Sequence, residues 1–351
     1  MDSERIFEII RSRLECKKMS DDPVAWNIIE NERKNLVPVS HAYQFVLYQN
    51  EYFKECCDEY INCSIVLYNK KEAIGIWPLS VSLKGEQWRL SSWDGDFVLP
   101  PVLLDILGVK GKRKIFSQCF EICDEICREL KIDRWASKES GISGEVSLWI
   151  RMLLERKNCC QRMSVEAYVD LSEEENKIFS SFRKSYKSCI TKGERLWVPE
   201  IINRSCSEEK IESCFNSFEE LHIEVAGRRT RTHETWARQC CSVKQTNDFA
   251  VLLYDKERKL VGASLYNTSG AFGYYGVGAY KRELFEFPLA HVSQWEAIKY
   301  MKEIGLKWYH LGTRFYEADW NEPTPKEISI GHFKEGFANR FFPSFYIIIK
   351  I

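Results

Sequence analysis

The stretch AVLLYDKERKLVGASLYN, at residues 250–267, repeats the pattern of SIVLYNKKEAIGIWPLSV, at residues 64–81. In each stretch a short charged turn separates two apolar runs, and this arrangement is typical of a β-hairpin. Tyr254 matches Tyr68 in the two copies. An order of elements that occurs twice in one chain strongly constrains the fold. The segments that follow the two hairpins show how far this repeat extends.

Four further segments follow each hairpin in the same order: an aromatic strand, a loop with proline, an amphipathic helix and a short strand. In the first copy they are 87–93, Pro101, 115–130 and 130–136, and in the second they are 271–279, Pro288, about 289–304 and 306–312. A β-β-β-α-β unit is therefore expected twice. The expected fold class is mixed α/β (α+β), with two tandem domains that are each a mixed β-sheet flanked by helices.

The boundary between the domains is expected near residues 160–172. There the helical pattern of VSLWIRMLLERK gives way to MSVEAYVDL, whose polar and apolar residues alternate as in a strand. Two domains also agree with the length of 351 residues, because one core seldom grows beyond about 250–300 residues. The sequence predicts an N-terminal domain at 1–165 and a C-terminal domain at 166–351.

Composition narrows the class of protein. Hydrophobic residues at 44% and charged residues at 29% are typical of a globular protein, and the net charge of -1 argues against a globally basic nucleic-acid binder. No apolar run reaches the ~18 residues of a membrane span, and the N-terminus lacks the apolar stretch of a signal peptide. We therefore expect a cytoplasmic protein without a membrane span. The fourteen cysteines are expected to be reduced, with Cys119, Cys123 and Cys127 packed on one helix face.

A basic segment follows the boundary. The pattern of residues 173–192 predicts one helix, which carries Arg183, Lys184 and Lys187. No acidic residue lies between Asn176 and Gly193. Such a run is either a solvated helix face or a site for phosphate or tRNA. Arg183, Lys184 and Lys187 are the candidate donor-phosphate contacts.

An arginine-rich loop follows the next predicted helix, which ends at Gly227. The loop RRTRTHETW contains Arg228 and Arg231, and guanidinium groups bind carboxylates or phosphates with two hydrogen bonds. Two interpretations stay open, recognition of an anionic substrate and structural pairing with acidic residues. His222 is on the apolar side of the preceding helix and is expected to be packed, not catalytic.

The C-terminal segment carries the most specific motif, F-K-E-G-F at residues 333–337. It follows a strand that ends at Gly312 and precedes a final apolar strand. Together with YGVGA at 275–279, the Pro288 loop and Trp295, the motif resembles the F-K-x-G-F signature of the FemAB-like branch of the GNAT-type acyltransferases. The resemblance covers about residues 165–345.

The resemblance implies an enzyme that forms an amide bond by moving an aminoacyl group from aminoacyl-tRNA to an amine. The acceptor would be a cell-envelope precursor or a peptide-like metabolite, and no metal or cofactor is implied. The substrate channel is expected where the third and fourth strands of the second domain separate. The implied site residues are Lys334 for the reacting carbonyl, Tyr275 for positioning, Arg228 and Arg231 for an anionic acceptor, and Arg314 and Phe333 for other substrate contacts.

Two alternatives remain, and the first is an acyl-CoA-dependent N-acyltransferase that acts on an amino sugar or another small amine. Ordinary GNAT enzymes hold pyrophosphate with a glycine-rich loop at a helix N-terminus. The corresponding loop here, YKRELFEFPLAHV, has no glycine, which leaves Lys281 and Arg282 as possible phosphate contacts. The second alternative is a non-catalytic binding module. The first domain lacks an F-K-x-G-F equivalent and is expected to be catalytically silent.

Overall fold

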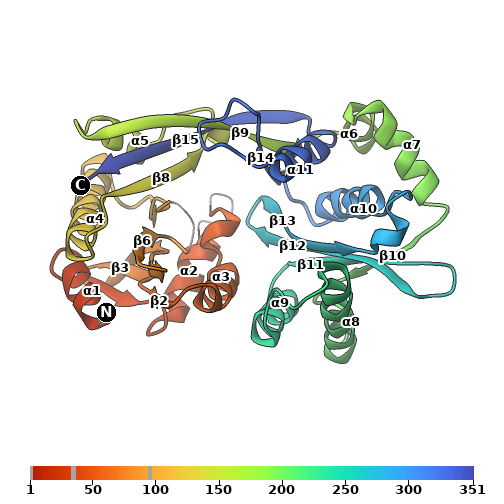
Figure 1. Ribbon diagram of the computed structural model, residues 1–351. Coiled ribbons are helices and arrows are strands. Elements are labelled where there is room, and N and C mark those ends of the chain that lie inside the picture. The colour runs from red at the N-terminus through yellow and green to blue at the C-terminus, as the bar shows by residue number, and fades with distance from the viewer. Residues whose placement is uncertain (1–2, 33–36, 94–96) are drawn as a thin grey trace. The chain divides into compact units, whose positions relative to one another are not determined.

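The computed structural model describes residues 3–32, 37–93 and 97–351, and the chain divides into two compact units (Figure 1). Unit 1 consists of Met1–Ser164 and Phe342–Ile351, and unit 2 consists of Val165–Phe341. Strand β9 (Cys159–Asp170) runs from unit 1 into unit 2, and strand β15 (Arg340–Lys350) returns the chain to unit 1. Unit 1 is therefore completed by a strand from the end of the sequence, whereas unit 2 is one continuous segment.

Unit 1 begins with helices and continues into short strands. Its elements are α1 (Ser3–Arg11), β1 (Cys16–Lys18), α2 (Pro23–Glu32), η1 (Val39–His41), α3 (Tyr43–Cys56), β2 (Glu59–Asn62), β3 (Ile65–Asn69), β4 (Glu72–Trp77), β5 (Ser80–Lys84), β6 (Gln87–Ser91), β7 (Val102–Leu103), α4 (Val109–Glu129), β8 (Arg134–Ser140), η2 (Gly141–Ser143) and α5 (Leu148–Leu154). The predicted first hairpin is the antiparallel pair β3 and β4. Strand β15 pairs with β8.

The first hairpin departs from the prediction, because its second strand does not continue unbroken to residue 81. Strand β4 ends before Pro78 and β5 begins after Leu79. Proline has no N–H for a sheet ladder, and the backbone N–H of Leu79 instead donates to Ser64 Oγ at 3.2 Å. Strands β1 to β7 of unit 1 therefore form two small sheets, β1-β3-β4-β7 and β2-β5-β6, to which the pair of β8 and β15 does not belong.

Helix α4 carries the three cysteines that the sequence places on one apolar face. Cys119, Cys123 and Cys127 are all fully buried in the core of unit 1. Burial raises the pKa of each thiol well above its usual range, because a thiolate is poorly solvated there. Their predicted role as core residues is confirmed.

Unit 2 contains α6 (Glu175–Ser181), α7 (Lys184–Gly193), β10 (Val198–Ile202), α8 (Glu208–Ala226), α9 (His233–Gln245), β11 (Phe249–Tyr254), β12 (Leu260–Ser269), β13 (Phe272–Tyr280), η3 (Arg282–Leu284), α10 (Leu289–Glu303), β14 (Trp308–Arg314) and α11 (Pro325–Glu335). Its strands lie in the order β10-β11-β12-β13-β14-β9. Neighbours in this order are antiparallel except for β13 and β14, which are parallel.

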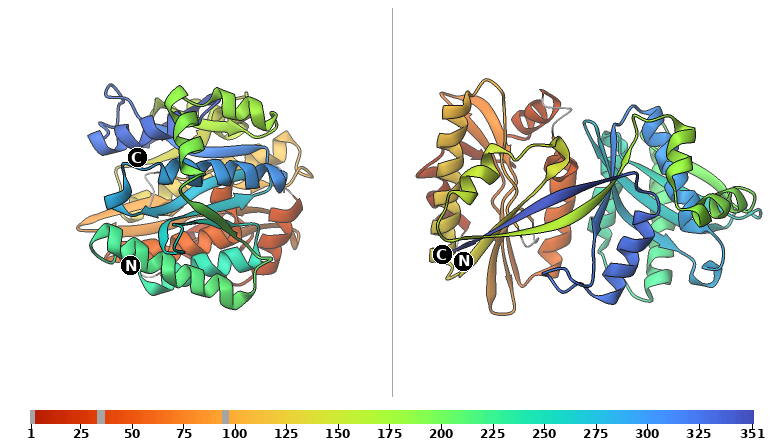
Figure 2. Two further views of the ribbon diagram at one scale, coloured as in Figure 1. Left: turned by 90° about the vertical axis from the view of Figure 1, so that its right-hand side faces the viewer. Right: turned by 90° about the horizontal axis from the view of Figure 1, so that it is seen from above.

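Helices cover both faces of the unit 2 sheet, with α8 and α9 on one face and α10 on the other (Figures 1 and 2). Strand β11 shows the alternation that this arrangement requires. Phe249, Val251 and Leu253 belong to the core under α10, whereas Ala250 and Leu252 belong to the core under α8 and α9. Helix α7 packs on the outside of α10.

The two units share one order of elements. The strands and helix β3, β4, β6, α4 and β8 of unit 1 correspond to β11, β12, β13, α10 and β14 of unit 2. In each unit, α-helices precede the hairpin and another α-helix follows the last repeated strand, α5 in unit 1 and α11 in unit 2. The predicted fold class, two repeated mixed α/β units, is confirmed.

One predicted helix is wrong. Residues 173–192 form two helices, α6 and α7, because the backbone is extended at Phe182 and Arg183. Phe182 is buried against Trp295 and Phe337, and the N–H of Arg183 donates to the carbonyl of Gly336 at 2.9 Å. These contacts with distant residues override the local helix propensity.

Candidate active site

Strands β13 and β14 separate in the middle of the unit 2 sheet. They pair at only three positions, and the last pair joins Tyr274 to His310. Beyond that pair, β13 continues to Tyr280 and β14 continues to Arg314 without further pairing between them. The separation therefore begins at Tyr275, which is the position expected from the resemblance.

A distortion of β14 lies directly beside the separation. The pairing of β14 with β9 shifts register between His310 and Gly312, as in a β-bulge. Gly312 has a φ of 108°, which a residue with a side chain rarely adopts. A Cβ atom at this position would lie 3.3 Å from Nζ of Lys334. Glycine at 312 thus gives both the backbone conformation and the room for the ammonium group.

Lys334 lies at this point on the last turn of α11. Thr324 and Glu327 form a capping box at the start of the helix, and Pro325 occupies its first turn. The ammonium of Lys334 lies 5.3 Å from the centroid of the Tyr275 ring, a cation–π arrangement.

Burial lowers the pKa of Lys334 to about 8. The cause is desolvation, which penalises the charged form, and no salt bridge offsets it within the described part of the chain. At pH 7 about nine in ten of such lysines still carry the proton. The arrangement therefore places a poorly solvated positive charge where the two strands separate.

The other residues of the F-K-E-G-F motif fix the position of Lys334. The Phe333 ring packs against Tyr186, His291 and Phe337, and the Phe333 carbonyl accepts a hydrogen bond from the Tyr186 hydroxyl at 3.0 Å. Phe337 is fully buried. A Cβ atom on Gly336 would lie 2.2 Å from the Tyr186 ring, so this position needs glycine. Both phenylalanines therefore anchor the motif in the core, and Gly336 allows the close approach of Tyr186.

Glu335 connects the motif to two arginines. Its carboxylate accepts a hydrogen bond from Nε of Arg314 at 2.8 Å, and Nη2 of Arg183 lies 3.9 Å away. Arg183 also donates to the carbonyl of His332 at 3.1 Å. Arg314 was expected to contact substrate and Arg183 to contact donor phosphate. In this structure both guanidinium groups hold α11 in place.

Three tyrosines pack against one another in the core beside Lys334. The Tyr275 ring packs edge-on against Tyr266, and Tyr266 packs in the same way against Tyr309. The Tyr309 hydroxyl donates to Oε1 of Gln294 at 2.5 Å. Burial raises the pKa of all three tyrosines well above the usual range, so they stay neutral and act as hydrogen-bond donors.

The arginine loop lies on the other face of the sheet, where α8 and α9 pack. Gly227 ends α8 with a φ of 70°, and Arg228 is exposed just beyond it. Nη1 of Arg231 lies 3.0 Å from Nε2 of His222. The structure therefore brings Lys334, Tyr275, Phe333 and Arg314 together and leaves Arg228 and Arg231 apart from them.

His222 has the packed environment that the sequence indicates. Its ring lies against Trp236, with 5.3 Å between the ring centroids. Burial, and then the positive charge of Arg231, lowers the pKa of His222 to about 4. The imidazole is therefore neutral at physiological pH.

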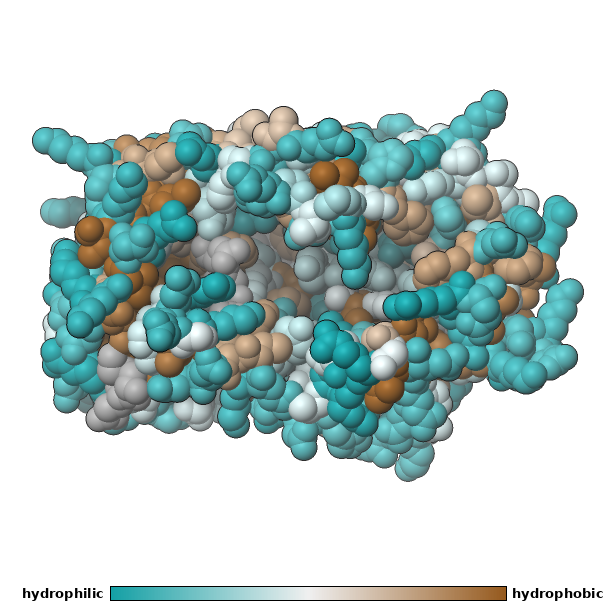
Figure 3. Space-filling model, in the orientation of Figure 1, coloured by the Kyte–Doolittle hydropathy of each residue, from teal (hydrophilic) through white to brown (hydrophobic). Residues whose placement is uncertain are grey.

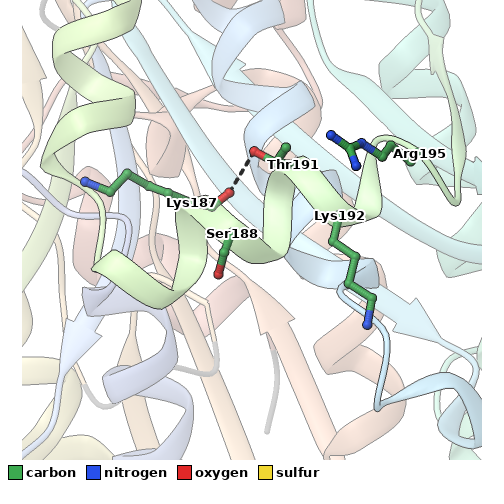
Figure 4. Close-up of a pocket in the computed structure, with 5 residues that line it drawn as sticks. All are labelled: Lys187, Ser188, Thr191, Lys192 and Arg195. Carbon is green, nitrogen blue, oxygen red and sulfur yellow. Dashed lines mark hydrogen bonds between the residues drawn. The ribbon is translucent and has the colours of Figure 1, made fainter.

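The remaining predicted donor contacts lie on the outer side of α7. Lys184 is exposed, and Nζ of Lys187 donates to the carbonyl of Ser180 at 3.0 Å. Lys187 also lines a shallow depression with Ser188, Thr191, Lys192 and Arg195 (Figure 4). This depression is on the side of α7 that faces away from α10.

Sequence reasoning missed Gly312, Glu335 and Tyr186 as parts of the site. Gly312 carried a usable signal, because an isolated glycine at the end of a strand indicates a bulge or a close approach. Glu335 occupies the variable position of the motif, and Tyr186 belongs to a helix that is distant in sequence. Neither has a local pattern that identifies it.

Comparisons with solved structures agree with this geometry. The crystal structure of FemX superposes with a TM-score of 0.57 at 13% identity, covering 85% of this chain and 90% of that one. L-PGS from Bacillus licheniformis gives a TM-score of 0.58 at 12% identity, covering 94% of this chain and 92% of that one. The C-terminal DUF2156 domain of a putative lysylphosphatidylglycerol synthetase from Agrobacterium fabrum gives 0.58 at 9% identity, with 93% and 92% covered.

The chain therefore shares the fold of FemX and of the two L-PGS-type structures. No protein-family model matches the sequence, and no curated protein matches it either. In this FemAB-like fold, the described residues contain no group of three or more His, Cys, Asp or Glu side chains placed to hold a metal ion. The helices of the described segments are also too short or too polar to span a membrane.

Proposed function

We propose that the protein transfers an aminoacyl group from aminoacyl-tRNA to an amine and so forms an amide bond. The acceptor would be an amine of a cell-envelope precursor or a peptide-like metabolite. The observation that carries the proposal is the position of Lys334, a desolvated ammonium held by the F-K-E-G-F motif where β13 and β14 separate. FemX and the L-PGS structures, which share the fold, are in keeping with this class of reaction.

The chemistry needs little beyond orientation and charge stabilisation. A neutral amine nitrogen attacks the ester carbonyl carbon, and negative charge develops on the carbonyl oxygen. A fixed cation beside that oxygen stabilises the tetrahedral state more than the neutral ester. When the C–O bond of the ester breaks, the leaving ribose hydroxyl takes up a proton and the amine loses one. Lys334 would supply the cation, and Tyr275 would hold it in place.

The choice between aminoacyl-tRNA and acyl-CoA as donor depends on the loop between β13 and α10. In ordinary GNAT enzymes, exposed backbone N–H groups of this loop bind pyrophosphate. Here four of these N–H groups already donate to carbonyls within the loop. They are the N–H groups of Leu284, Phe285, Phe287 and Leu289. Helix α7 also covers the start of α10, since a Cβ atom on Gly193 would lie 2.3 Å from Val292. This favours an aminoacyl ester over acyl-CoA.

A direct test gives the purified protein two kinds of donor with hydroxylamine as a general amine acceptor. We expect aminoacyl hydroxamate from a pool of charged tRNA and none after ribonuclease treatment. Acyl-CoA donors are expected to give no hydroxamate above the uncatalysed rate. Turnover with acyl-CoA and none with charged tRNA would instead support the acyl-CoA-dependent N-acyltransferase. No turnover with either would favour a non-catalytic binding module.

A further inference from the structure

The outer side of α7 carries positive charge. Lys187, Lys192 and Arg195 line the shallow depression on this helix together with the hydroxyls of Ser188 and Thr191 (Figure 4). None of these three cations takes part in a salt bridge between described residues. A group of cations whose lining contains no carboxylate is suited to phosphate groups.

Exposed aromatic side chains border this cationic surface. Phe285 and Phe287, in the loop between β13 and α10, are 66% and 38% exposed. Nζ of Lys192 lies 5.6 Å from the centroid of the Phe287 ring, so the loop and α7 form one continuous surface. Hydrophobic patches lie among hydrophilic side chains on the face of the molecule that Figure 3 shows.

A buried hydrogen-bond donor lies behind this surface. The Trp197 ring packs edge-on against Phe287 with 6.1 Å between centroids, and the tryptophan is only 8% exposed. Its indole Nε1–H is buried and has no acceptor among the residues that the structure describes. A buried polar group without a partner is rare in folded proteins and indicates a missing ligand or water.

We propose that this surface binds the single-stranded 3′ end of an RNA. Its phosphates would contact Lys192 and Arg195, and a base would stack on Phe287. Cations that follow the backbone and aromatic rings that stack on bases are the two common features of single-strand binding. The RNA would be the donor of the proposed aminoacyl transfer, so the inference rests on that function for the identity of its ligand.

The position of the surface agrees with such a ligand. The loop with Phe285 and Phe287 directly follows β13, and the strands separate at Tyr275 on the same strand. Five residues of extended chain from Tyr275 to Tyr280 span roughly 17 Å. The start of the separation and the loop that borders the cationic surface are therefore connected by one short stretch of β13.

An anionic membrane is the competing ligand, because lysines beside exposed phenylalanines also bind lipid surfaces. Two features favour RNA. Lys187, Lys192 and Arg195 lie close together on one side of α7, where they can contact neighbouring phosphates of one strand. Only two exposed phenylalanines, one of them packed edge-on against Trp197, offer little area for insertion into lipid.

The test measures the affinity of the protein for a fluorescent single-stranded RNA that ends in CCA. We expect Lys192→Glu with Arg195→Glu to weaken binding at least tenfold and to reduce the salt dependence of log K by about 1.4, since each phosphate contact on a single strand contributes about 0.7. Phe287→Ala is expected to weaken binding by about 5- to 150-fold, the range for one stacked base.

Matched controls come from the same unit. Lys256→Glu with Lys326→Glu makes the same change in net charge at exposed positions away from this surface. Phe341→Ala removes another exposed phenylalanine, which is 45% exposed. All three substitutions are expected to leave the RNA affinity within about twofold, an effect typical of surface positions. Equal losses in the control and test variants would overturn the proposal.

Two further measurements separate the possible outcomes. Binding to vesicles of phosphatidylglycerol and phosphatidylcholine that depends on Phe287, without any effect of Phe287 on RNA, would make the surface a lipid site. Turnover with aminoacyl adenosine, a donor without phosphates, is expected to be unchanged in Lys192→Glu with Arg195→Glu. The wild-type protein could bind RNA as expected and still give no turnover with aminoacyl adenosine. That result would contradict the proposed aminoacyl transfer and would support the RNA site.

Discussion

The two units differ at one corresponding position of their repeated fold, the gap between the third and fourth repeated strands. In unit 2, β13 and β14 separate after Tyr274 and His310. In unit 1, residues 97–99 lie between the corresponding strands β6 and β8. The N–H of Ser92 donates to the carbonyl of Phe97 at 3.1 Å, and the N–H of Val98 donates to the carbonyl of Ala136 at 2.7 Å. The separation in unit 1 is therefore filled by backbone.

The helices that follow these strands show the same contrast. In unit 1, Nε1 of Trp149 on α5 donates to Ser137 at 2.8 Å, and the Ser137 hydroxyl donates to the carbonyl of Val98 at 2.7 Å. In unit 2, α11 brings the ammonium of Lys334 to the corresponding place. A satisfied hydrogen-bond network stabilises the fold, whereas a desolvated cation costs stability and is retained for function. This contrast supports our proposal that the first repeat has a structural role and the second repeat carries the chemistry.

The largest effect is expected from Lys334→Met. Removing one oxyanion-stabilising group lowers turnover by about 10²- to 10³-fold. The same change should raise the free energy of unfolding at pH 7 by on the order of 1–3 kcal/mol, because it removes the cost of burying an ammonium. The measurements are single-turnover rates and thermal unfolding.

The control for that variant is Lys326→Met, an exposed lysine on the same helix. It is expected to change neither turnover nor stability by a measurable amount. If Lys334→Met kept turnover within threefold of wild type, the two units would not differ in the way we describe.

Gly336→Ala is expected to have the next largest effect. The added methyl group would overlap the Tyr186 ring, and relief of that overlap must move the end of α11. Overpacking costs about 1–3 kcal/mol of stability, and a shift of about 1 Å in a reacting group can lower turnover about 10²-fold. Kinetics and chemical denaturation measure both effects. Gly108→Ala, where an added Cβ meets no atom within 4 Å, is the control.

A smaller effect is expected at Tyr275. Leucine removes the ring that faces Lys334, and the loss of a cation–π contact of about 0.5–2 kcal/mol corresponds to roughly 2- to 30-fold in turnover. Phenylalanine keeps the ring and is expected to stay close to wild type. If phenylalanine were as damaging as leucine, the hydroxyl and not the ring would be the important part.

The smallest effect on turnover is expected in unit 1. Trp149→Phe leaves the buried Ser137 hydroxyl without its indole donor, so the free energy of unfolding should fall by about 1–3 kcal/mol. Turnover at a temperature where the variant is folded is expected to stay within twofold. A large loss of turnover would assign unit 1 a part in catalysis.

The sequence predicts the repeated elements because each has a local pattern, such as the alternation of residues 250–267 and the apolar face of α10. It also names Lys334 and Tyr275 as candidate site residues, since F-K-x-G-F and the preceding strand are local signals, and their roles stay predictions. The parts that it misses depend on contacts between distant residues. Arg183 and Arg314 bind Glu335, Phe182 interrupts a helix to reach the core, and residues 97–99 fill the separation in unit 1.

The pH dependence of turnover tests the role of Lys334 most directly. Hydroxylamine as acceptor is already neutral at pH 7. The α-amino group of the aminoacyl donor also titrates in this range, but a comparison of wild type with a Lys334 variant on the same donor cancels that contribution. Since burial lowers the pKa of Lys334 to about 8, the cation is present below that pH and is lost above it. Arginine stays protonated throughout this range. We predict that the ratio of wild-type kcat to that of Lys334→Arg is constant below pH 8 and falls about tenfold per pH unit above it. A ratio that rises above pH 8 would show that the neutral amine is the active form, and a flat ratio would show that Lys334 does not titrate in the reaction.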